Sequence, residues 1–158
     1  MEAMIIADTD FLSSFLKIER LHLIFSALNA KSITIAKAVL HELEHAPVQQ
    51  VFLDALHSSE DTIIIQDVED VSSENFGKGE LESIALAKRM NALLLMDNRK
   101  AAQFAKEQGI TVMSIPSFLL YCRINKILSN EELRTIISDL KEKDYYEFNQ
   151  QVKQRLLQ

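Results

Sequence analysis

The sequence predicts an α/β protein: a mainly parallel central sheet of about five strands, flanked by helices. Short apolar runs rich in Ile, Leu and Val alternate with stretches in which apolar residues recur every three or four positions. Such alternation is typical of parallel sheets whose strands are joined by crossover helices. The length of 158 residues fits one domain with a real core. We expect a single domain over residues 1–158, with a core at about 4–115 and a helical extension at about 116–158.

The predicted strands are short apolar runs, mostly of β-branched or leucine side chains, bounded by polar residues. In chain order they are Met4–Asp8, Ile33–Ile35, Ile63–Ile65, Leu93–Met96 and Ile110–Met113. Helical spacing fills the intervals between them and the chain beyond Pro116. The predicted helices cover Phe11–Leu16, Leu21–Leu28, Lys37–Glu44, a stretch opened by Glu80, Phe118–Ile127, Glu131–Leu140 with Ser129 or Asn130 as cap, and Tyr145–Leu157.

Three further residues mark helix ends. Pro47 suits the first turn of the helix after Glu44, because proline has no amide hydrogen to lose there. Gly109 stands where a helix that ends near Gln108 needs a left-handed cap. Asp10 follows the first strand and is expected to cap the first helix.

Composition and charge exclude several classes of protein. No apolar run approaches the roughly 20 residues of a membrane span, and the N-terminus lacks the pattern of a signal peptide. Cys122 is the single cysteine, so no internal disulfide is possible, and we expect it to be buried. These features favour the cytoplasm. The net charge of −6 argues against a protein that simply coats nucleic acid, but not against a nuclease whose carboxylates bind metal ions.

Four carboxylates stand where apolar runs end or helices begin: Asp8, Glu42, Glu80 and Asp97. Asp8 and Asp97 each close a predicted strand, and functional groups in an open α/β sheet gather beyond the carboxyl ends of the strands. Like charges packed there repel each other unless a cation lies between them. Hard oxygen ligands without thiolates favour Mg²⁺ or Mn²⁺ over zinc. The sequence therefore predicts an acidic, metal-dependent active site.

The segments that carry these acids have the order and spacing of a known family. "IIADTDFLSSF", "AKAVLHELE", "GKGELESIALAKRMNALLLMDNRKAA" and "EQGITV" together resemble a PIN domain, over about Met4–Val112. The resemblance implies a three-layer α/β fold and an endoribonuclease that hydrolyses phosphodiester bonds in single-stranded RNA with Mg²⁺ or Mn²⁺. Many prokaryotic members are VapC-type toxins, so it also implies an antitoxin protein as a candidate partner and a homodimer.

Carried over by position, the resemblance assigns catalytic and metal-binding roles to all four acids. Asp8 matches the first acid of the family and Glu42 the acid of the early helix. Glu80 matches the third acid and Asp97 the acid after the central strand. Asn98 stands where many members carry a further acid, which bears on whether a second metal ion binds. Candidate phosphate contacts near the four acids are Thr9, Lys78, Arg99 and Lys100.

The extension beyond Pro116 has its own consequence. Its helices are rich in Leu, Ile, Phe and Tyr, and they carry more apolar surface than one face of the sheet could cover. Soluble proteins rarely leave such surface exposed, and twofold self-association is the commonest way to cover it. We therefore expect a homodimer, with Phe118 and Leu133 in its interface.

Three alternatives remain open. His41, Glu42 and His45 form the HExxH pattern of zinc proteases, with Glu42 as a base. Asp8 and Asp10 resemble the acids of haloacid-dehalogenase-type phosphatases, in which the first is a nucleophile and the second an acid/base. The third alternative is a catalytically silent PIN-like module that binds RNA or protein. Beside the site, Glu82 is expected to face solvent or to assist a water molecule.

Overall fold

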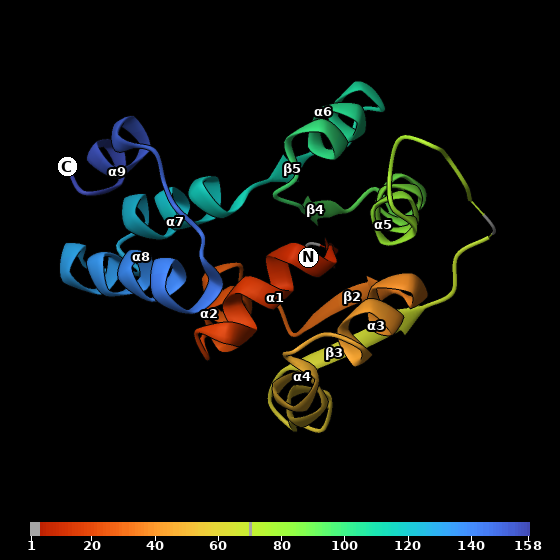
Figure 1. The fold of residues 1–158 in the computed structure, drawn as a ribbon, viewed down its shortest axis with the longest axis horizontal. Coiled ribbons are helices and arrows are strands. Elements are labelled where there is room, and N and C mark those ends of the chain that lie inside the picture. The colour runs from red at the N-terminus through yellow and green to blue at the C-terminus, as the bar shows by residue number, and fades with distance from the viewer. Residues whose placement is uncertain (1–3, 70) are drawn as a thin grey trace.

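One parallel sheet of five strands forms the centre of the protein, in the spatial order β3-β2-β1-β4-β5. The structure is a computed structural model that describes residues 4–69 and 71–158 (Figure 1). The strands are β1 (Ile5–Ala7), β2 (Ser32–Ala36), β3 (Thr62–Gln66), β4 (Leu93–Leu95) and β5 (Val112–Met113). Each predicted strand is present within one or two residues of its expected ends, so the predicted fold class is confirmed.

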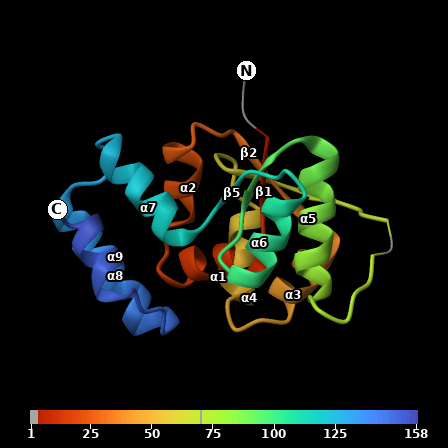
Figure 2. The same cartoon turned by 90° about the horizontal axis from the view of Figure 1, so that it is seen from above.

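Helices join the strands and continue beyond the sheet. The chain proceeds outward from β1 through β2 to β3, then returns to β4 on the other side of β1. Because crossovers between parallel strands are right-handed, this reversal puts the helices between β1 and β3 on one face and those between β3 and β5 on the other. The helices beyond β5 lie together at one end of the molecule (Figure 2). Within the described residues the helices are α1 (Thr9–Lys17), α2 (Leu21–Ala27), α3 (Lys37–Glu44), α4 (Gln49–Leu56), α5 (Lys78–Met90), α6 (Arg99–Glu107), α7 (Ile115–Ile124), α8 (Asn130–Asp144) and α9 (Gln150–Leu156).

The register of the central strand β1 sets where a site can form. Ala7 pairs with Leu95 of β4, and the N–H of Asp8 donates to the carbonyl oxygen of Leu95 at 2.9 Å. On its other side, Ile6 pairs with Thr34 of β2. Asp8 therefore leaves the sheet at its carboxyl edge, where the strand order reverses, and ligands of open α/β sheets bind at such switch points.

The C-terminal helices pack onto this core through aromatic side chains. Phe11 and Phe15 of α1 stack with ring centroids 5.4 Å apart, and both meet the edge of Phe118 from α7. All three rings are fully buried, as is Leu133 of α8. Cys122 is buried as expected, and burial raises the pKa of its thiol to about 12. Phe118 and Leu133 are thus core residues of the monomer, and the prediction that they form a dimer interface is wrong.

Local capping explains most helix ends. Gly109 has a φ of 84°, directly after α6, so the predicted left-handed cap is confirmed. The Ser129 hydroxyl accepts from the amide of Glu132 at 3.1 Å, and the Glu132 carboxylate accepts from the amide of Ser129. This reciprocal capping box starts α8. Ser114 caps α7 in a similar way through the amide of Ser117, so that helix begins three residues earlier than Phe118.

Other predicted helix ends are wrong for identifiable reasons. Asp8 itself is the N-cap of α1, so Asp10 lies within the first turn and does not cap the helix. Pro47 precedes α4 by two residues. The predicted helix Tyr145–Leu157 is divided: α8 continues to Asp144, Tyr145 adopts a left-handed φ of 54°, and α9 begins only at Gln150. Tyr145 is 88% exposed and is not part of an apolar stripe.

In residues 4–69 and 71–158 none of the helices combines the length and the apolar character that a bilayer crossing requires.

Candidate active site

Among the described residues, Asp8 stands out because its ionisable side chain is only 2% exposed. Its backbone is fixed by the strand pairing with Leu95 on one side and by the start of α1 on the other. Although it occupies the N-cap position, its side chain makes no capping bond and is free to face the interior. The hydroxyl of Ser83 on α5 donates to Asp8 Oδ1 at 3.4 Å.

The surroundings of Asp8 raise its pKa from 3.8 to about 7. Burial is the largest cause, because it removes water from the charged form. The backbone amide of Thr9 acts in the opposite direction by donating to the carboxylate. The negative charges of Asp10, Glu80 and Glu42 then raise the pKa further. The fold thus brings Asp8, Glu42 and Glu80 into one electrostatic cluster, although they are far apart in sequence.

Glu42 reaches this cluster from α3, and two neighbours define its position. The hydroxyl of Thr9 donates to Glu42 Oε2, so Thr9 holds a carboxylate and is not simply open to a phosphate. Gly79 at the start of α5 leaves room for the same side chain. A Cβ at Gly79 would lie 2.7 Å from both carboxylate oxygens of Glu42, closer than any real contact. Sequence analysis had not identified Gly79 as part of the site.

Glu80 and Glu82 lie two residues apart at the start of α5 but have different roles. Glu80 is the third residue of the helix, not its first, and its carboxylate accepts from the amide of Gly77 at 3.1 Å. Glu82 is 4% exposed and accepts from the amide of Ala38 at 3.0 Å. The prediction that Glu82 faces solvent is therefore wrong. Its buried carboxylate anchors the start of α3, the helix that carries Glu42.

Asp97 is held in a different environment from the other three predicted acids. Its Oδ1 accepts from the amide of Ile115 at 2.9 Å. Tyr146 lies beside it: burial first, and then the Asp97 carboxylate, raises the pKa of the Tyr146 hydroxyl far above its usual value. Asp97 and Asp10 both line a small cavity of about 240 Å³ next to the cluster. Asp97 is thus held by partners of its own, Ile115 and Tyr146.

The segment that follows Asp97 is fixed by its own cap. The side chain of Asn98 accepts from the amide of Ala101 at 3.0 Å and starts α6. The residue that stands in place of a further family acid is therefore a structural cap in this chain. Tyr146 was not recognised from the sequence, because it lies about fifty positions from Asp97 and only the fold brings the two together.

The candidate phosphate contacts differ in their availability. Lys78 lies 4.0 Å from the Glu82 carboxylate and is partly neutralised by it. Arg99 and Lys100 are exposed at the start of α6 and line a cleft of about 1130 Å³, together with Phe76 and Phe104. These two rings lie 5.2 Å apart. Arg99 also lines a second cleft, which contains Asp97.

The donor set fits a hard divalent cation better than zinc. Among the described residues, no three His, Cys, Asp or Glu side chains converge into a ready-made metal cage. A catalytic zinc ion needs three protein ligands, whereas Mg²⁺ keeps several waters and takes one or two carboxylates plus substrate phosphates. His41 and His45 are exposed, and His45 Nδ1 lies 2.7 Å from the carbonyl oxygen of its own helix at His41. Asp8, Glu42 and Glu80 offer only carboxylate oxygens, the type of ligand that hard divalent cations take.

A family model decides the relationship of this chain to known proteins. The model described as "DUF3368: PIN domain" matches residues 4–158, which includes the C-terminal helices. The chain belongs to the PIN-domain family. PIN domains are commonly nucleases that use divalent metals. In this chain the buried Asp8 lies at the carboxyl edge of the sheet, where open α/β sheets bind their ligands.

Solved structures agree with the fold of this PIN domain. A PilT N-terminus domain protein from the hyperthermophilic archaeon Sulfolobus solfataricus P2 is similar, with a TM-score of 0.55 and 19% identity over 73% of this chain and 89% of that one. A domain of a functionally unknown protein from Methanocaldococcus jannaschii has a TM-score of 0.51 and 20% identity over 72% of this chain and 91% of that one. No curated protein matches the chain in sequence.

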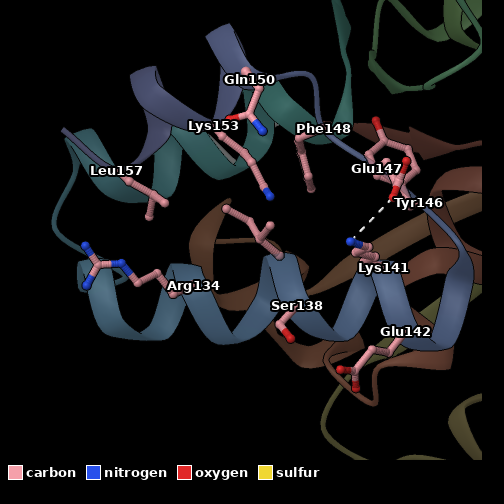
Figure 3. Close-up of a pocket in the computed structure, with 11 residues that line it drawn as sticks. Arg134, Ser138, Lys141, Glu142, Tyr146, Glu147, Phe148, Gln150, Lys153 and Leu157 are labelled. Carbon is pink, nitrogen blue, oxygen red and sulfur yellow. Dashed lines mark ion pairs between the residues drawn. The ribbon is translucent and has the colours of Figure 1, made fainter.

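A further cavity of about 580 Å³ lies between α8 and the segment that leads into α9 (Figure 3). Lys141 and Glu147 form an ion pair at 3.6 Å on its rim. None of the four predicted acids lines it, so it is separate from the candidate active site.

The raised pKa of Asp8 predicts how the stability of the metal-free protein depends on pH. The folded state favours the protonated carboxyl, with a pKa of about 7, whereas the unfolded chain titrates near 3.8. The contribution of Asp8 is therefore most favourable below pH 4 and is lost as the pH rises to 7. Over that interval the free energy of unfolding should fall by as much as about 4 kcal/mol on account of Asp8. Urea denaturation in a chelating buffer from pH 4 to pH 8 measures it.

The matched variants are Asp8→Asn and the exposed Asp54→Asn. Asp8→Asn should flatten the decline in stability with pH, because the amide does not titrate, while Asp54→Asn should keep the wild-type profile. Identical profiles for wild type and Asp8→Asn would contradict the assignment of the titration to this buried carboxyl.

Proposed function

We propose that this PIN domain is a metal-dependent endoribonuclease that hydrolyses phosphodiester bonds in single-stranded RNA with Mg²⁺ or Mn²⁺. The observation that carries the proposal is Asp8, buried at the carboxyl edge of the sheet, whose pKa is raised first by burial and then by neighbouring acids, two of them from other helices. Such an arrangement costs stability in the absence of a cation. A fold retains it where a cation and its substrate compensate for the repulsion.

The chain supplies specific tasks at this site. Bound Mg²⁺ or Mn²⁺ would supply charge stabilisation and an activated water for phosphodiester hydrolysis. Asp8, Glu42 and Glu80 would bind the ion, and Thr9 orients Glu42 through its hydroxyl. Ser83 and the amide of Thr9 orient Asp8. Asp97 is held by Ile115 and Tyr146 and lines the neighbouring cavity. It would therefore contribute its carboxylate from that side of the site.

Single-stranded RNA is the substrate class favoured by the adjoining clefts. Arg99 and Lys100 offer positive charge to phosphates, and Phe76 and Phe104 offer aromatic surface in the same cleft. The second cleft continues from Arg99 past Asp97 to Arg155. A groove lined by both basic and aromatic side chains can bind the phosphates and bases of unpaired nucleotides with little regard to base sequence.

The alternatives lead to different measurements. A haloacid-dehalogenase-type phosphatase would need Asp8 as an accessible nucleophile, yet Asp8 is 2% exposed; such an enzyme would hydrolyse a small phosphomonoester in preference to RNA. A silent PIN-like module would bind RNA without cleaving it. A zinc hydrolase would copurify with zinc and depend on His45.

The biological setting is also part of the proposal. We propose a cytoplasmic toxin of VapC type, restrained by an antitoxin protein, because many prokaryotic PIN domains have this role. A short neighbouring reading frame that encodes a DNA-binding N-terminus would support this role. A stand-alone RNA-processing enzyme would lack such a neighbour.

We further propose that the protein forms a homodimer through α7. Ile124 is 66% exposed and Tyr121 is 37% exposed on this helix, one turn apart. Exposed apolar side chains in adjacent turns favour association, and twofold pairing is the commonest form.

The first prediction from this proposed function concerns catalysis. Asp8→Asn should reduce Mg²⁺-dependent cleavage of single-stranded RNA to background, because it removes a charged ligand for a hard cation. The same variant should fold at least as well as the wild type, since it relieves repulsion and desolvation. His45→Ala is the matched control and should retain activity. Equal loss in both variants would favour the zinc alternative, and loss of neither would remove the proposed site.

A second prediction isolates the position of Glu42. In Gly79→Ala the new Cβ must displace the Glu42 carboxylate, which is the flexible end of a side chain, so the fold should tolerate the change. Alanine within the helix should even stabilise it, by up to about 1 kcal/mol. The Mg²⁺ concentration for half-maximal cleavage should rise clearly. Gly77→Ala is the control, because its Cβ would lie 3.5 Å from Glu80, an ordinary contact. Equal metal dependence in the two variants would contradict this role of Gly79.

The third prediction concerns assembly. At micromolar concentration, sedimentation should give twice the 18.0 kDa chain mass. Ile124→Lys should convert the protein to the monomer by burying a charge in the interface, whereas Tyr145→Lys, at an exposed site elsewhere, should not. A wild-type protein that sediments as a monomer would rule out the dimer.

A further inference from the structure

The strand β3 forms one edge of the sheet, with β2 as its neighbour. Figure 1 shows it at the outer side of the sheet, beyond β2. All five of its residues pair with β2, from Ser32 with Thr62 to Ala36 with Gln66. The strand is therefore regular along its whole length, and its second side faces outward.

The backbone groups on that outer side can be identified from the register. The amide of Thr62 donates to the carbonyl oxygen of Lys31 at 3.3 Å, so Thr62 directs its backbone groups towards β2. Because successive residues of a strand direct their N–H and C=O groups to alternate sides, Ile63 and Ile65 direct theirs towards the open edge. An edge of this kind is a template for a further strand.

The side chains of β3 are also unusually exposed for apolar residues. Ile64 and Ile65 are each 42% exposed, and they project from opposite faces of the sheet. By contrast, every residue of β1 is buried. Natural edge strands are commonly protected by Lys, Pro or a bulge, yet the sequence Thr62–Gln66 contains none of these charges or prolines. A strand added at this edge would cover apolar surface on both faces.

Negative charge flanks this apolar edge at both ends. Glu60 and Asp61 precede the strand, and Asp67 and Glu69 follow it, while no Lys or Arg occurs between residues 58 and 69. Glu60 and Glu69 are exposed. Asp61 contacts His22 at 2.8 Å and Asp67 contacts Lys37 at 3.5 Å. The surplus of acid at both ends favours a partner with positive charge at both ends.

We propose that the open edge of β3 binds an extended segment of a partner polypeptide, apolar in its middle and flanked on both sides by Lys or Arg. Main-chain hydrogen bonds to Ile63 and Ile65 would add the segment as a sixth strand. A second copy of this chain fits less well. Twofold pairing of two β3 strands is antiparallel, so pairing centred on Ile64 would bring Asp61 of one copy opposite Asp67 of the other. Like charges directly opposite each other destabilise such pairing.

This inference concerns a surface other than the acidic site and does not depend on RNA cleavage. The probe is a synthetic peptide of five alternating valine and threonine residues with two lysines at each end. Titrated into the ¹⁵N-labelled protein, it should shift the amide signals of Ile63 and Ile65 and slow their hydrogen exchange. A peptide with glutamates in place of the lysines should bind at least about tenfold more weakly.

Two variants make the test specific. Ile65→Pro removes an amide that points to the open edge and not to β2, so the sheet should tolerate it while peptide binding is lost. The double variant Glu60→Lys and Glu69→Lys changes only exposed charges and should weaken binding of the lysine-flanked peptide about tenfold. Binding that leaves the amides of Ile63 and Ile65 unchanged, or that survives both variants, would overturn the proposal. Self-association abolished by Ile65→Pro would overturn it in favour of a second copy.

Discussion

The pairing of β1 with β4 is the constraint on which the rest of this structure depends. The amide of Asp8 is committed to Leu95, so the carboxylate of Asp8 emerges at the buried centre of the sheet edge and not on the surface. Burial there is what raises its pKa most, before any neighbouring charge is considered. An ionised carboxylate at such a buried position is unfavourable unless hydrogen-bond donors or a cation offset its charge.

The direct junction between β2 and α3, together with the start of α5, brings the other acids of the cluster towards Asp8. Glu82 of α5 is buried to cap the start of α3, which immediately follows β2. That contact fixes α3 against α5 and thereby sets the positions of Glu42 and Glu80 relative to Asp8. Gly79 completes the arrangement by leaving space for the Glu42 carboxylate. The acidic cluster is thus positioned by one buried glutamate that does not itself belong to it.

The C-terminal helices have a similar double role. Phe118 closes an aromatic group with Phe11 and Phe15, which ties α7 to α1 directly behind Asp8. Asp144 at the end of α8 accepts from Ser14 and forms an ion pair with Lys17 at 2.8 Å. The extended segment after Asp144 then places Tyr146 beside Asp97. What the sequence presents as an appendage is in fact the far wall of the candidate site, in agreement with a family model that extends to residue 158.

The sequence by itself determined the order of elements and the identity of the acids. Five apolar runs were sufficient to predict the sheet: β1, β2 and β4 are apolar because both their faces are largely buried, and β3 has the same apolar pattern although it lies at the edge. The caps at Gly109 and Ser129 could also be predicted from the sequence, because each depends only on residues within one helical turn. The strand ends placed Asp8 and Asp97 at one edge, since parallel strands end on the same side.

Only the tertiary structure decided which of those residues meet. Glu82 looked like a surface charge because its partner, the amide of Ala38, is 44 positions away in the chain. Phe118 and Leu133 looked like interface residues because the sequence does not reveal that α1 is there to cover Phe118. The division of the four acids into a cluster and a separately held Asp97 depends on Ile115 and Tyr146, which no local pattern connects to it. Packing between distant segments sets burial, and burial sets the charge state on which the chemistry depends.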